Sequence, residues 1–103
     1  MKAPEFATDD AVLRELGRRV ARHRLNRDWT QARLAEEAGV SLPTVARLER
    51  GESTSMVSFL RVLRALELMR DLARLVPDVP VSPVQQLRTR DQTRKRASRR
   101  RKR

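Results

Sequence analysis

The feature that most constrains the fold is the stretch QARLAEEAGVSLPTVARLER at residues 31–50. Its two halves carry apolar residues at helical spacing, and Gly39, Val40 and Ser41 separate them. Glycine supplies the left-handed backbone conformation that ends a helix in a tight turn. Two short helices joined in this way must cross at close range, and Ala35 is small where a bulky side chain would push them apart. Packing therefore sets the residue type at many positions of this stretch.

The apolar side chains of the stretch predict a small core beneath a preceding helix: Leu34, Ala38, Val40, Val45 and Leu48. Residues 42–44, 46 and 47 are not needed for that core. Two short helices in which some positions pack the core and others remain free are typical of a helix-turn-helix, whose second helix can enter a major groove. An ordinary helical bundle that matches the pattern by coincidence is the alternative.

Helical spacing predicts three helices up to residue 50. Their expected limits are the cap Asp9 or Asp10 to about Arg24 for the first, the cap Thr30 to Ala38 for the second, and the cap Ser41 to Arg50 for the third. Proline is tolerated in the first turn of a helix, so Pro43 fits the start of the third. Gly51 stops it.

Two further helices are expected after the polar residues 53–55. The first has the apolar face Met56, Phe59, Leu60, Leu63 and Leu66, and the second follows with little or no break through Leu68, Met69, Leu72, Leu75 and Val76. Three prolines between residues 77 and 83 then prevent regular helix, although residues 84–87 allow one more turn. The predicted fold class is all-α, a compact bundle of about five helices over residues 9–76. A flexible arm (1–8) precedes it, and a linker (77–87) and a basic tail (88–103) follow.

Charge is distributed unevenly along the 103 residues, whose formal net charge is +11. Residues 88–103 hold ten Lys and Arg against one Asp, which is +9, and the other 87 residues carry 14 basic and 12 acidic side chains, which is +2. The excess indicates an anionic partner, nucleic acid first and an anionic membrane surface second. The tail lacks apolar residues and is expected to be disordered alone. It is open to three interpretations: binding DNA phosphates, docking on an acidic protein, or keeping the chain in solution.

Several classes of function are disfavoured by what the sequence lacks. There is no cysteine, and the single histidine, His23, has no neighbours that suggest a metal site or a catalytic triad. No constellation of Ser and Asp suggests catalysis, so we expect no enzyme activity, no cofactor and no metal. No apolar run approaches the ~20 residues of a membrane span. The first ten residues have no signal-peptide core, which predicts a cytoplasmic protein.

The stretch WTQARLAEEAGVSLPTVARLERG resembles the Xre/Cro/CI-type regulators of bacteria and phages. The residues that carry the resemblance are Thr30-Gln31, Leu34-Ala35, Gly39-Val40-Ser41, Val45 and Leu48-Glu49-Arg50-Gly51, and the similarity covers roughly residues 10 to 76. It implies a lambda repressor-like domain that binds double-stranded DNA and represses transcription. It also implies a homodimer that reads a palindromic operator, and a nucleoid-associated protein of bacterial or phage origin.

The resemblance assigns roles to individual residues. The expected base contacts are Ser41, Leu42, Pro43, Thr44 and Arg47, and Arg47 is the best candidate for a bidentate contact with guanine. Relatives often have two polar residues where this chain has Leu42 and Pro43, which can touch a thymine methyl but donate no hydrogen bond. The expected phosphate contacts are Gln31, Arg33, Arg50, Ser53, Thr54 and Ser55.

The resemblance also makes predictions about the structural roles of Gln31, of Arg33 and of an ion pair. Gln31 either touches a phosphate or braces the base-reading helix. Arg33 stands where many relatives have a glutamate that completes a capping box, so it is expected to reach a phosphate instead. Arg24 and Glu49 stand where relatives often bury an ion pair that links the first helix to the third.

The second half of the chain is also similar to HipB-like antitoxins, which bind HipA-like kinase toxins and repress the shared operon. The features that carry this similarity are LRALELMRDLARLVP, the Ser-Pro linker and the Arg-rich end. One alternative function is therefore a protein-interaction antitoxin whose main role is to neutralise a toxin. The other is a nonspecific nucleic-acid-binding protein driven by its basic tail.

Overall fold

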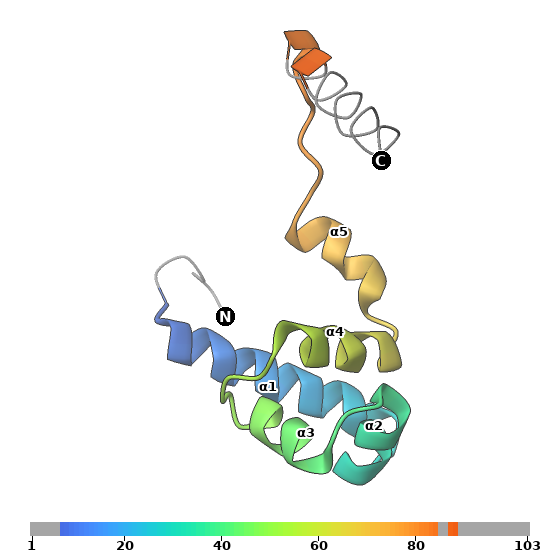
Figure 1. The fold of residues 1–103 in the computed structure, drawn as a ribbon. Coiled ribbons are helices and arrows are strands. Elements are labelled where there is room, and N and C mark those ends of the chain that lie inside the picture. Colours follow the sequence, from blue (N-terminus) through green and yellow to red (C-terminus); the bar gives the residue numbers. More distant parts are fainter. Residues whose placement is uncertain (1–6, 85–86, 89–103) are drawn as a thin grey trace, which may run out of the picture. The chain divides into compact units, whose positions relative to one another are not determined.

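The structure, a computed structural model, describes residues 7–84 and 87–88. Within these residues it contains helices and no strands, in the order α1 (Asp9–Asn26), α2 (Gln31–Ala38), α3 (Leu42–Glu49), α4 (Met56–Ala65), a 3₁₀ turn (Met69–Asp71) and α5 (Leu72–Leu75) (Figure 1). The predicted all-α class with five helices is confirmed. The chain separates into two units, Met1–Leu72 and Ala73–Arg103.

The first helix begins and ends slightly outside its predicted limits. Thr8, rather than Asp9 or Asp10, is the N-cap, and its hydroxyl accepts the backbone N–H of Ala11 at 3.2 Å. The two aspartates lie in the first turn instead, where a negative charge interacts favourably with the helix dipole. At the other end the helix continues to Asn26, two residues beyond the expected end.

The helix-turn-helix forms as predicted. Thr30 caps α2 by accepting the N–H of Arg33 at 3.0 Å, and Ser41 caps α3. Gly39 lies between them in the left-handed region at φ 69°. The third helix ends at Glu49, one residue earlier than expected, and Arg50 and the left-handed Gly51 follow it.

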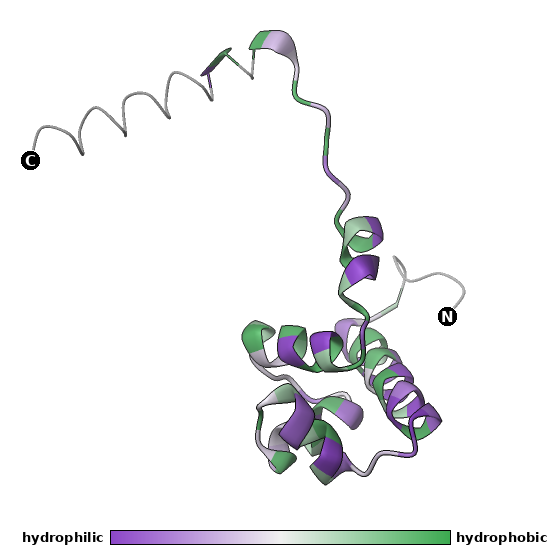
Figure 2. Ribbon diagram, turned by 90° about the vertical axis from the view of Figure 1, so that its right-hand side faces the viewer, coloured by the Kyte–Doolittle hydropathy of each residue, from purple (hydrophilic) through white to green (hydrophobic). Residues whose placement is uncertain are grey.

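One core holds α1 to α4 together. Its buried members are Val20, Leu34, Ala35, Ala38, Val45, Leu48, Val62 and Leu66, and Trp29, Val40 and Phe59 are among the half-buried residues that pack against it. Helix α3 packs against α1, α2 and α4, and α2 also packs against α4. Each of these helices carries both apolar and polar residues, as a helix with one buried and one solvent-facing side requires (Figure 2). Four of the five predicted core residues of the helix-turn-helix are buried, and Val40 is half-buried.

The predicted apolar face of α4 is wrong at two positions. Met56 is the first residue of the helix and is 78% exposed. Val62, which the prediction omitted, is completely buried. Its spacing from Phe59 and Leu66 places all three on one helical face.

A distinct break follows α4, contrary to the expectation of little or none. Glu67 adopts a left-handed conformation at φ 59°, which ends the helix. The Arg27 guanidinium donates to the carbonyl oxygen of Leu66 at 3.1 Å and lies 3.5 Å from the Glu67 carboxylate. The predicted fifth helix is consequently divided into a 3₁₀ turn and the short α5.

The second unit is described only in part. Residues 77–82 form no helix, as their prolines predict, and residues 83, 84, 87 and 88 are helical. The turn expected at residues 84–87 thus begins one residue earlier, at Pro83. The expectations for most of the arm (1–6) and of the basic tail (89–103) lie outside the described residues, and the domain limits expected from the sequence remain predictions.

Candidate nucleic-acid interface

Helix α3 starts with a local hydrogen-bonded cap. The Ser41 hydroxyl accepts the backbone N–H of Thr44 at 3.2 Å, and the two side-chain hydroxyl oxygens lie 2.7 Å apart, within hydrogen-bond distance. Pro43 occupies the first turn, where its missing N–H costs the helix no hydrogen bond. The cap thus uses one of the two hydroxyl protons of these predicted base-contacting residues, and one proton remains for an outside acceptor.

The inner face of α3 is held by a charged network. Two nitrogens of Arg24, Nε and Nη2, donate to the two oxygens of Glu49 at 2.7 and 3.0 Å, and Gln31 Nε2 donates to Glu49 at 3.0 Å. The third arginine nitrogen donates to the carbonyl of Trp29 at 2.8 Å. The Arg24 and Glu49 side chains are only 13% and 7% exposed, so this ion pair is largely shielded from water. It joins the end of α3 to α1 and to the start of α2, as expected.

Helix α3 has three exposed side chains, Leu42 and Pro43 in its first turn and Arg47 on its outer face. Leu42 is 46% exposed. Within the described part of the chain, the Arg47 side chain has no hydrogen bond and no ion pair. Thr44 is half-buried. The structure therefore brings the five predicted base contacts together on the first turns of one helix, but only Arg47 retains a full set of free donors.

Two of the arginines predicted to contact phosphate have acidic partners. Arg33 donates to Glu37 at 2.9 Å, one helical turn away, and its guanidinium lies 5.3 Å from the centre of the Trp29 ring. Arg50 donates to Glu52 at 2.5 Å. These pairs are exposed, so water screens them and a phosphate can replace the carboxylate at small cost. Gln31 donates to Glu49, the contact that its predicted bracing role requires, and its predicted phosphate contact stays a prediction.

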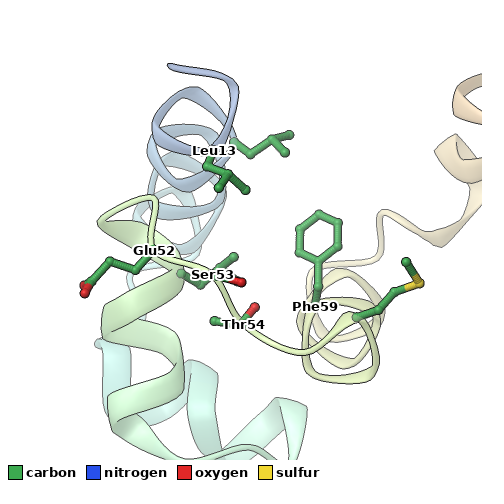
Figure 3. Close-up of a pocket in the computed structure, with 8 residues that line it drawn as sticks. Leu13, Glu52, Ser53, Thr54 and Phe59 are labelled. Atoms are coloured by element: carbon green, nitrogen blue, oxygen red, sulfur yellow. The ribbon is translucent and has the colours of Figure 1, made fainter. Parts of the chain in front are cut away.

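The loop between α3 and α4 contains the three predicted hydroxyl contacts. Ser55 caps α4: its Oγ accepts the N–H of Ser58 at 3.1 Å and donates to the Ser58 hydroxyl at 2.9 Å. Ser53 and Thr54 have no hydrogen-bond partner among the described residues. They line a pocket of about 220 Å³ whose other walls include Leu13 and Phe59 (Figure 3).

The helix-turn-helix family model matches residues 20–73, just over half of the chain. The chain belongs to the Xre/Cro/CI-type helix-turn-helix family. Proteins of this family are DNA-binding regulators, and the match spans the last part of α1 from residue 20 onward, the whole helix-turn-helix, α4 and the start of α5. A search of curated proteins returned no match to this chain.

Sequence reasoning missed one residue on which the Xre-type arrangement depends. Gly17 is buried in α1, and a Cβ placed there would collide with the backbone carbonyl oxygens of Leu48 and Glu49, the latter at 2.7 Å. The end of α3 thus lies directly against α1 at this glycine. A glycine in the interior of a helix is the signal that could have revealed the contact, because it lowers helix stability and needs a packing reason.

Trp29 is half-buried and packs against the core, and the centre of its ring lies 5.2 Å from the Arg27 guanidinium and 5.3 Å from that of Arg33. These are cation–π distances. The described residues of the Xre-type chain contain no cluster of three or more acidic or histidine side chains that could hold a metal ion. None of the helices described is long and apolar enough to span a bilayer.

Proposed function

We propose that this Xre-type protein is a sequence-specific repressor that binds double-stranded DNA as a homodimer through α3. The observation that carries the proposal is the contrast on α3, where a shielded ion pair holds the inner face and Arg47 projects from the outer face with no partner in the described chain. A rigid helix with a free guanidinium suits the major groove, where arginine recognises guanine O6 and N7.

The remaining predicted contacts form the second part of the proposal. Ser41, Leu42, Pro43 and Thr44 approach base edges beside Arg47. Gln31, Arg33, Arg50, Ser53, Thr54 and Ser55 contact the flanking phosphates. The exposed position of Arg33 and Arg50, and the partner-free hydroxyls of Ser53 and Thr54 within the described chain, support these roles. The expected location, in the bacterial or phage cytoplasm and on the nucleoid, follows from this function.

Dimerisation is supported by apolar side chains after the 3₁₀ turn. Leu75 and Val76, at the end of the apolar stripe, are 71% and 75% exposed. A two-fold dimer would bury such residues against their copies and double the contacts to DNA. Sedimentation should show a dimer, at least with operator DNA. A monomer at micromolar concentration both with and without operator would contradict the proposal.

Selection from a pool of randomised DNA duplexes tests the function with the full chain. We expect an enriched palindrome whose half-sites lie about one helical turn, ~34 Å, apart. Footprinting on the promoter of the protein's own gene should protect the same sequence. A pool in which no sequence is enriched would contradict sequence-specific binding.

The antitoxin function is a second candidate, favoured by apolar exposure in the second unit. Val79, Val84 and Leu87 are 59–72% exposed in a short segment that a protein partner could cover. A HipA-like kinase toxin is the partner that the resemblance suggests. Co-purification with the product of a neighbouring gene, abolished when residues 76–87 are replaced by a Gly/Ser linker of equal length, would support it.

The tail-driven function makes a different prediction. Deletion of residues 88–103 removes ten basic side chains and one acidic one. Each phosphate that the shortened protein no longer neutralises reduces the slope of log K against log salt by ~0.9. We expect operator and random duplexes to be bound more weakly by similar factors, with a flatter salt dependence for both. An unchanged slope would show that the tail does not lie on DNA.

A further inference from the structure

The first turn of α3 presents apolar surface where a DNA-reading helix usually presents donors. Leu42 and Pro43 are exposed although neither side chain can make a hydrogen bond. They have no role in the core, whose members on this helix are Val45 and Leu48. An exposed leucine gains free energy only where it meets another apolar group.

The hydroxyls next to Leu42 and Pro43 do not make up for the missing hydrogen-bond donors. Those of Ser41 and Thr44 lie 2.7 Å apart, and Ser41 also accepts the N–H of Thr44 to cap the helix. At most one hydroxyl proton remains for an outside acceptor. Hydrogen-bonded recognition by this helix therefore rests mainly on Arg47, and the rest of its contact surface is apolar.

The apolar and charged parts of this surface are neighbours. Pro43 and Arg47 are four residues apart in α3, so they lie on the same face, one turn apart, with Cβ atoms ~6 Å from each other. Successive base pairs rise by about 3.4 Å, so the two side chains meet adjacent or next-adjacent base pairs. In the major groove the apolar group that a base edge offers is the 5-methyl of a pyrimidine, which thymine carries.

We infer that α3 reads a guanine beside a pyrimidine 5-methyl group. Arg47 donates to guanine O6 and N7, and Leu42 and Pro43 pack against the methyl group of the neighbouring base pair. Thymine and 5-methylcytosine present the same methyl group, and either fits this description. The inference rests on the proposed function and names the base chemistry that the proposed site selects.

Deoxyuridine is the probe, because it lacks only the 5-methyl group of thymidine. In the duplex selected by the full chain, each thymidine is replaced in turn by deoxyuridine. We expect about fourfold weaker binding at the thymidine beside the guanine, the loss that corresponds to one buried carbon. Thymidines outside the half-site serve as the control and should be insensitive. At the same position, a C·G pair is compared with its 5-methylcytosine form, which should bind about fourfold more tightly than the unmethylated pair.

A protein variant shows whether α3 is responsible. Leu42→Ala with Pro43→Ala removes the apolar surface at exposed positions and keeps helix-forming residues there. Its free energy of unfolding checks that the fold is kept. In this variant the thymidine and deoxyuridine duplexes should bind equally well, while the preference for guanine remains.

The outcomes separate this inference from the proposed function. A selected site at which every deoxyuridine substitution is neutral would overturn the methyl contact but leave sequence-specific binding intact. A deoxyuridine effect that persists in the double variant would also overturn it. A pool with no enriched sequence would overturn the proposed function and this inference with it.

Discussion

The two faces of α3 differ in almost every respect although the helix has only eight residues. On the inner face, Val45 and Leu48 are buried and Glu49 accepts hydrogen bonds from Arg24 and Gln31. On the outer face, Pro43 and Arg47 are exposed, and the Arg47 side chain has no hydrogen bond or ion pair within the described chain. The inner face determines where the helix lies, and the outer face is left free for a ligand.

The arginines of the domain differ in the same way. Arg24 is almost buried and its donors are satisfied by Glu49 and by a backbone carbonyl. Arg33 and Arg50 are exposed and paired with acids that can be exchanged. Arg47 has no acidic partner at all among the described residues. A guanidinium is available for binding to the degree that the fold leaves it unpaired, which net charge does not reveal.

The largest effect is expected where α1 meets the inner face of α3. Gly17→Ala places a methyl group against two backbone carbonyls, which cannot move independently of their helix. We expect the free energy of unfolding to fall by about 3 kcal/mol in urea denaturation. The matched control is Gly39→Ala, where no atom lies within 4 Å and only the left-handed φ of 69° opposes the change. That variant should lose about 1–2 kcal/mol, and a larger loss than for Gly17→Ala would contradict the close approach.

A smaller effect is expected from the shielded ion pair. Glu49→Ala leaves Arg24 largely buried without its partner, which should lower the free energy of unfolding by about 2 kcal/mol. Arg24→Ala and the double variant complete a thermodynamic cycle, and we expect a coupling of at least about 1 kcal/mol. Additive losses would show that the pair does not hold α3 in place.

The smallest effect is expected at Glu15, a half-buried carboxylate whose arginine partners are exposed. Hydrogen bonds from Arg18 and then Arg19 lower the pKa of Glu15 to about 2. A carboxyl whose pKa is lower in the folded chain than in the unfolded chain stabilises the folded chain at pH values above the unfolded pKa of ~4.3. This contribution to the free energy of unfolding disappears as the pH falls toward 2. Because the site is open to water, Glu15→Gln should cost less than Glu49→Ala at neutral pH, and the difference from the wild type should shrink in acid. A difference in the free energy of unfolding between Glu15→Gln and the wild type that grows in acid would contradict the lowered pKa of Glu15.

The helix-turn-helix could be predicted from the sequence because its local signals agree. Caps at Thr30 and Ser41, a left-handed Gly39 and apolar residues at fixed offsets all indicate the same arrangement. The Arg24–Glu49 pair came from the family resemblance, and the structure contains it. These elements are specified by neighbours along the chain or by a pattern common to the family.

The features that escaped prediction depend on contacts distant in sequence. Gly17 matters only because α3 passes beside it, and the left-handed Glu67 ends α4 where Arg27, 39 residues before Leu66, reaches the last turn. The predicted buried face of α4 included Met56 and omitted Val62, whereas Met56 is 78% exposed and Val62 is completely buried. The pairing of Arg33 with Glu37 and of Arg50 with Glu52 is local instead, and the four-residue spacing of the first pair is a sequence signal that could have revealed it.

The most direct test of the account is the binding of Arg47→Ala to operator and to random duplexes under the same salt conditions. Because Arg47 is exposed and unpaired within the described chain, the variant should keep its free energy of unfolding to within about 0.5 kcal/mol. We expect operator binding to weaken by about 1–3 kcal/mol while binding to random DNA is nearly unchanged. Equal losses on both duplexes would contradict a base-reading role for the outer face of α3.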